Sequence, residues 1–203
     1  MKEEKTAISK NWPGAFGVYK TSKEAIMLNI SSILVLIAIS IVASIILNII
    51  FGNDNFSGIA SFLLAPFFTV VMYYSVFKKK IESGQIVDKT SPHYVQLLFL
   101  SILIYLSLVF SLLLFIIPFF FVMPRLVLAP YYLVHKNLSA MDAFKMSWEK
   151  SQPHQGKVWG IIGATIVMAL PALTIIGIPF AIYFVFMYSA AVAVLFKFVS
   201  GTK

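Results

Sequence analysis

The chain has 203 residues, of which 60% are hydrophobic and 12% are charged, about half the charged share of a typical soluble domain. A water-soluble protein of this length could not bury so much apolar surface in one core. The net charge is +8, but the basic residues flank apolar segments, which indicates contact with anionic lipid and argues against nucleic-acid binding. The absence of cysteine excludes disulfides and thiolate metal sites and is consistent with a bacterial membrane protein.

Residues 1–24 precede the first long apolar run, and we expect them to form a cytoplasmic amphipathic segment. Trp12 and Lys20 give this segment an aromatic and basic character, although Gly14 and Gly17 disfavour a helix. Two interpretations remain open for it. It either forms a surface for lipid or a protein partner, or it fixes the angle at which the first spanning helix enters the membrane.

The first predicted hairpin consists of two spans, residues 25–51 and 57–77, joined by a polar turn at residues 52–55. The first run covers roughly 40 Å as a helix, which is enough to cross a bilayer with some tilt. The second run returns to three consecutive lysines, Lys78, Lys79 and Lys80. The positive-inside rule places these lysines at the cytoplasmic interface.

The stretch from residue 94 to 134 is apolar over roughly 60 Å of helix, twice the thickness of the hydrocarbon core. A single crossing would put the lysine-rich linkers on its two sides in opposite compartments, against the positive-inside rule. We therefore expect a span at residues 94–117, a turn near Ile117 and Pro118, and a short span at residues 119–134. Prolines distort this fourth span, so neighbouring helices must satisfy the backbone groups that they free.

The last predicted hairpin has spans at residues 158–176 and 179–199. The predicted fold is an all-α polytopic bundle over residues 25–203, with six spans arranged as three hairpins and both termini in the cytoplasm. The tryptophans agree with this topology, because aromatic rings favour the membrane interface. All three lie at the proposed cytoplasmic side: Trp12, Trp148 and Trp159.

Residues 139–151 are too short and too charged to span, and they predict an amphipathic helix lying in the cytoplasmic interface. Ser139 followed by Asp142 is typical of a helix N-cap. The apolar face carries Met141, Phe144 and Trp148. This face serves either as a lipid or partner surface or as a structural element that orients the next span.

Arg125 is the only arginine and, apart from Lys197 near the end of the last predicted span, the only charged side chain inside a predicted span. A charge at the bilayer centre costs about 2.5–3.5 kcal/mol even on insertion scales, so Arg125 is a candidate functional residue. No acidic residue lies in any predicted span to pair with it. Its partner would be a freed carbonyl, a lipid phosphate or a bound anion, unless the side chain extends to the outer headgroups.

Groups that could support catalysis are dispersed. Of the eight acidic residues, only Asp54 is predicted to lie outside the cytoplasmic segments. The histidines, His93, His135 and His154, lie in cytoplasmic linkers without metal-ligand spacing, and we expect them to be solvated. The sequence therefore predicts no enzyme, no metal and no cofactor.

Three segments carry a resemblance to a known group: residues 124–130, 139–148 and 156–159. They resemble bacterial six-span membrane proteins related to the membrane domain of some glycerophosphodiester phosphodiesterases. The matching residues are Arg125, Ala143, Phe144, Ser147, Trp148, Gly156 and Trp159. The resemblance implies a six-span fold; the group is largely of unknown function, and no catalytic residue can be transferred.

These observations predict a non-enzymatic multi-pass protein of the bacterial cytoplasmic (inner) membrane. We expect it to act as a scaffold or lipid-interacting domain, with anionic lipid on its cytoplasmic side and with a protein partner or a homodimer as further options. The alternative is a small transporter or permease domain with an anion site at Arg125. A membrane-embedded enzyme acting on lipid is the third and weakest hypothesis.

Overall fold

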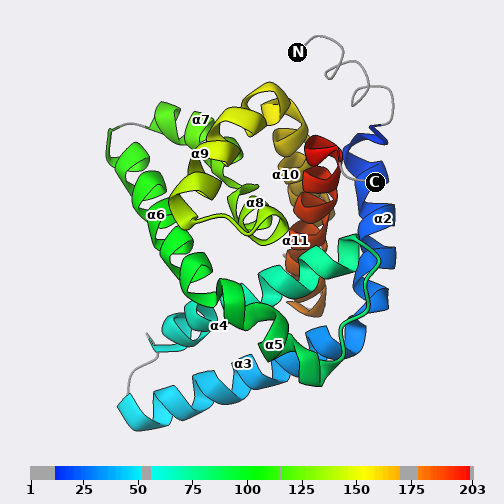
Figure 1. The fold of residues 1–203 in the computed structure, drawn as a ribbon, viewed down its shortest axis with the longest axis vertical. Coiled ribbons are helices and arrows are strands. Elements are labelled where there is room, and N and C mark those ends of the chain that lie inside the picture. The colour runs from blue at the N-terminus through cyan, green and yellow to red at the C-terminus, as the bar shows by residue number, and fades with distance from the viewer. Residues whose placement is uncertain (1–11, 52–55, 115, 170–177, 202–203) are drawn as a thin grey trace.

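A computed structural model describes residues 12–51, 56–114, 116–169 and 178–201, and every regular element in these ranges is helical (Figure 1). This confirms the all-α class. Residues 1–11 of the N-terminal segment and residues 170–177 of the last predicted hairpin lie outside the described residues. The α-helices are α2 (Gly14–Leu28), α3 (Ile30–Phe51), α4 (Phe56–Val76), α5 (Ile86–Thr90), α6 (Tyr94–Leu114), α7 (Ile116–Leu126), α8 (Ala129–Lys136), α9 (Ala140–Ser151), α10 (Gln155–Ala169) and α11 (Ile178–Ser200). Short 3₁₀ turns connect them at η1 (Ser83–Gln85), η2 (Ser91–His93) and η3 (Gln152–His154).

Three helical stretches are long and apolar enough to cross a membrane: Ile30–Phe51, Gly58–Val76 and Ser83–Leu114. Their surfaces leave large apolar side chains uncovered; Ile49 on α3 is 77% exposed and Leu113 on α6 is 80% exposed. An apolar surface of this extent is costly in water and favourable in lipid. The structure therefore indicates a membrane protein, while six crossings and their direction stay predictions.

The first predicted span, residues 25–51, is wrong at its beginning. The chain breaks at Asn29, and residues 25–28 belong to α2 instead of α3. In Figure 1, α2 runs beside α11 while α3 and α4 lie crosswise to α2 as a hairpin. The Asn29 carbonyl still accepts from the Ile33 amide at 3.0 Å, while its side chain, 1% exposed, bonds to the end of α4 and the segment that follows α4. Its amide donates to the Ser75 hydroxyl at 2.8 Å and to the Lys79 carbonyl at 3.0 Å. Its oxygen accepts from the Ile81 amide at 2.7 Å.

The N-terminal segment is more integrated than expected. Helix α2 begins at Gly14, which adopts a positive φ of 80°, and continues past residue 24 to Leu28. One face of α2 packs against α10 and α11 and buries Val18 and Tyr19. The Tyr19 hydroxyl donates to the carbonyl of Ile161 at 3.1 Å. Helix α2 is therefore part of the core.

The fourth predicted span, residues 119–134, is also corrected, because two helices with a break at Val127 and Leu128 replace one. Helix α7 begins at Ile116, before the turn predicted near Ile117 and Pro118, so that Pro118 lies in the first turn of α7. A proline is tolerated there because the first helical amides have no intrahelical acceptor. Pro130 occupies the equivalent place at the beginning of α8.

The remaining boundaries lie close to the predictions. Helix α6 ends at Leu114, three residues before the predicted end of its span, and α10 begins at Gln155, before residue 158. Residues 190–196 of α11 are at most 3% exposed, which makes this part of α11 the centre of the core. The predicted cap of α9 is confirmed, since the Ser139 hydroxyl accepts from the Asp142 amide at 3.2 Å.

Candidate functional site

The break between α7 and α8 exposes a backbone carbonyl inside the protein. In a continuous helix the Arg125 carbonyl would accept from the amide of residue 129, but α8 begins anew at Ala129. The Ser147 hydroxyl on α9 donates to this carbonyl at 2.6 Å, and Ser147 is fully buried. A neighbouring helix therefore satisfies a backbone group that the break frees, as a membrane-embedded break requires.

The Arg125 side chain lies against the same helix. Its guanidinium carbon is 4.7 Å from the centre of the Trp148 ring, a cation–π contact. Its Nε is buried and has no hydrogen-bond partner, and no carboxylate among the described residues forms an ion pair with it. A buried donor without an acceptor costs free energy, about 1–3 kcal/mol or more for a charged group. An anion at this position would remove that cost through charge-assisted hydrogen bonds.

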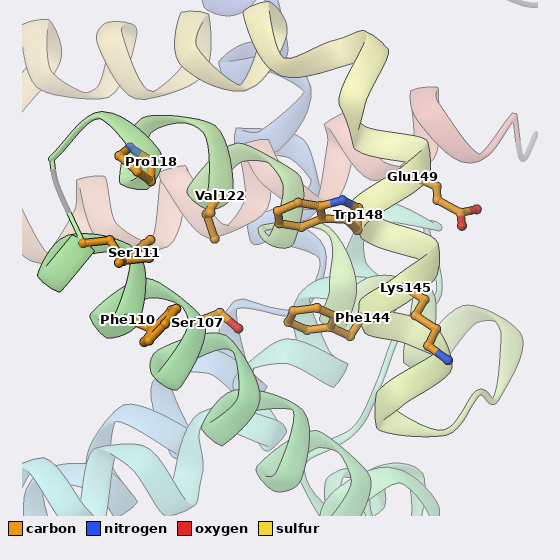
Figure 2. Close-up of a pocket in the computed structure, with 10 residues that line it drawn as sticks. Ser107, Phe110, Ser111, Pro118, Val122, Phe144, Lys145, Trp148 and Glu149 are labelled. Atoms are coloured by element: carbon orange, nitrogen blue, oxygen red, sulfur yellow. The ribbon is translucent and has the colours of Figure 1, made fainter.

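A groove of about 440 Å³ lies beside Trp148, between α6, α7 and α9 (Figure 2). Phe144 and Trp148 point from α9 toward α6 and α7, while Lys145 and Glu149 point away from them. The volume falls within the range of about 300–1,000 Å³ that is usual for small-molecule sites. The remaining lining residues are Ser107, Phe110, Ser111, Leu114, Pro118 and Val122.

The residues predicted to face the cytoplasmic interface contact protein in the structure. Phe144 and Trp148 are half-buried beside the groove, which fits the interpretation of this face of α9 as a structural element better than that of a free lipid or partner surface; Met141 on the same face is exposed. Trp159 packs on Phe120 of α7 with ring centres 5.2 Å apart. Phe144 and Trp148 share their groove with Leu114 and Pro118, which the predicted topology places at the outer turn, so this contact disagrees with the predicted cytoplasmic position of the two rings.

Two other predicted interface groups lie away from this groove. Trp12 meets Phe198 edge-on at 5.6 Å, and the Lys157 ammonium lies 5.1 Å from the Trp12 ring. Burial lowers the pKa of Lys157. The three lysines that follow α4 are exposed: Lys78, Lys79 and Lys80.

The expectation of solvated histidines is wrong for two of the three. His154 is buried, with 8% of its surface exposed. The His135 Nδ1 lies 2.7 Å from the Tyr73 hydroxyl, and the imidazole stacks on Phe77 with ring centres 5.6 Å apart. No group of three potential metal ligands is present among the described residues.

The sequence singled out Arg125 and Trp148 separately, and the structure brings them together. The sequence could not identify Ser147 as the donor to the Arg125 carbonyl, although the prolines predicted that a neighbouring helix must satisfy freed backbone groups. Ser147 and Trp148 are adjacent on α9 and contact the backbone and the side chain of the same residue, Arg125. We refer to Arg125, Ser147 and Trp148 as the arginine site.

No protein-family model, no curated protein and no solved structure matches this chain.

Proposed function

We propose that this protein is a non-enzymatic multi-pass protein of the bacterial cytoplasmic membrane that binds an anionic lipid headgroup at the arginine site. The observation that carries the proposal is the buried, unpartnered Nε of Arg125 next to Trp148. A phosphate offers a guanidinium two parallel hydrogen bonds and a compensating charge. Water alone would satisfy the donor but would leave the charge unbalanced in an apolar surrounding.

The proposed topology has six crossings with both termini in the cytoplasm. The alternation of lysine-rich linkers with turns that carry almost no charge supports it. Helix α11, with 23 residues, is long enough for one crossing, and α7 and α8 together would form another. A broken helix is tolerated at membrane depth where protein covers the break, and Leu126, Leu128 and Ala129 are fully buried.

Two substitutions of Arg125 test headgroup binding. The melting temperature is measured in nanodiscs of neutral lipid, with and without phosphatidylglycerol. Anionic lipid should raise the melting temperature of the wild type. Arg125→Lys should lose most of that rise, because an ammonium keeps the charge but not the planar fork, and Arg125→Leu should lose all of it.

Lys150→Leu is the matched control, because Lys150 is an exposed cation on α9 outside the arginine site. It should respond to anionic lipid like the wild type. An identical lipid response of the wild type and both Arg125 variants would contradict headgroup binding at this site. A loss of response in Lys150→Leu as well would show that the effect comes from general surface charge.

One observation favours the alternative of a small transporter. A second cavity, of about 610 Å³, lies between α3, α4, α8 and α11. Its described lining is uncharged but contains the hydroxyl residues Ser40, Ser61, Thr69, Tyr131 and Ser189. The hydroxyls of Ser40, Thr69 and Tyr131 already donate to backbone carbonyls, so they would offer a neutral polar solute hydrogen-bond acceptors. Rapid labelling of Thr69→Cys by a water-soluble thiol reagent would favour this alternative, and protection of the cysteine would count against it.

A further inference from the structure

We infer that the groove between α6, α7 and α9 holds one acyl chain of a phospholipid whose phosphate is bound at the arginine site. This inference rests on the proposed function. It specifies that the ligand is a phospholipid and not a free anion.

The groove is lined mainly by apolar side chains, and its polar groups near α6 are already bonded. The Ser107 hydroxyl donates to the Leu103 carbonyl and the Ser111 hydroxyl donates to the Leu108 carbonyl, each at 2.8 Å. These serines therefore offer no free donor to a solute in the groove. An acyl chain would remove apolar wall from water without leaving these hydroxyl donors unpaired.

The groove adjoins an exposed apolar surface of α6 that is favourable in contact with lipid. Phe110 lines the groove and is 64% exposed, and its neighbours Leu106, Val109 and Leu113 on α6 are also exposed. The apolar surface of α6 thus continues from the outside of the protein into the groove. In a bilayer, the molecules that meet this surface are acyl chains, which can enter without crossing a polar barrier.

Trp148 connects the groove to the guanidinium. Its side chain lines the groove, and its ring lies under Arg125. Lys145 and Glu149 point away from Trp148 on the other side of α9 and carry opposite charges, so Arg125 supplies the positive charge next to Trp148 (Figure 2). This arrangement places a positive charge beside an apolar groove, which matches a phosphate attached to a hydrocarbon chain.

The test measures quenching of Trp148 fluorescence by phosphatidylglycerol with a nitroxide in the middle of its acyl chain. The variant Trp12→Phe and Trp159→Phe leaves Trp148 as the only tryptophan. The probe should quench Trp148 strongly. Trp159, isolated in the same way and packed on Phe120, is the comparison ring and should be quenched less.

Ser107→Phe fills the groove from α6, opposite Phe144 (Figure 2), and Ser107→Ala is its matched control. Ser107→Phe should lose most of the quenching and Ser107→Ala should keep it. Val122→Phe fills the same groove from α7 and serves if Ser107→Phe does not fold. Unchanged quenching in a folded, filled variant would overturn the inference.

The two proposals fail separately. If the lipid response depends on Arg125 but quenching ignores the filling of the groove, a headgroup binds and the chain lies elsewhere. If filling abolishes quenching but the lipid response is independent of Arg125, the groove takes a chain and the headgroup assignment is wrong.

Discussion

Ser147→Ala removes the hydroxyl that donates to the Arg125 carbonyl at 2.6 Å. The carbonyl lies at the buried break between α7 and α8, where Leu126 and Leu128 are fully buried, so water cannot readily replace the donor. Leaving a buried acceptor unsatisfied costs about 1–3 kcal/mol. For a chain of this size, each kcal/mol corresponds to about 2–4 °C in melting temperature, so a decrease of about 2–12 °C is expected.

The measurement is thermal unfolding of the purified protein in one neutral detergent or lipid, followed by intrinsic fluorescence. Ser101→Ala is the matched control, because the Ser101 hydroxyl donates to the Leu97 carbonyl within its own helix. That carbonyl keeps its helical amide donor, so the control should change little. A decrease no larger in Ser147→Ala than in Ser101→Ala would refute the idea that Ser147 stabilises the break.

Two further predictions concern buried polar groups. Asn29→Ala should lower the free energy of unfolding by on the order of 3 kcal/mol, because the Lys79 carbonyl and the Ile81 amide lose their partner. Asn48→Leu should lower it little or raise it, since the Asn48 Oδ1 is buried without a partner. Equal losses in the two variants, measured by thermal or denaturant unfolding, would contradict this account.

The sequence predicted the helical class because long apolar runs and lysine-rich linkers are local features. It missed the break at Asn29, since an asparagine near a predicted interface gives no sign that its partners lie 46 to 52 residues away. The break at Val127 and Leu128 was anticipated only as a distortion. Proline marks where a helix loses a donor, but the position of the break depends on packing against α9.

The candidate site likewise has one feature that the sequence predicted and one that it could not predict. Arg125 could be singled out from the sequence because a charge in an apolar run is costly wherever it lies. The contact of Arg125 with Trp148 could not be predicted from the sequence, because the predicted topology placed Arg125 inside a span and Trp148 at the cytoplasmic surface. The contact arises because α9 packs along α6 and α7, with the Ala140 amide bonded to Gln96 at the beginning of α6. This tertiary packing has no local sequence signal.

The six-crossing topology is tested most directly by cysteine labelling with a membrane-impermeant reagent in intact cells, because the natural chain has no cysteine. Cysteines at Asn55 and Gly177 should react from outside. Cysteines at the exposed positions Ser83 and Gln152 should react only after the cells are opened. Labelling of the Gln152 cysteine from outside would show that the stretch from α6 to α8 crosses an odd number of times, and the proposed topology would then be wrong.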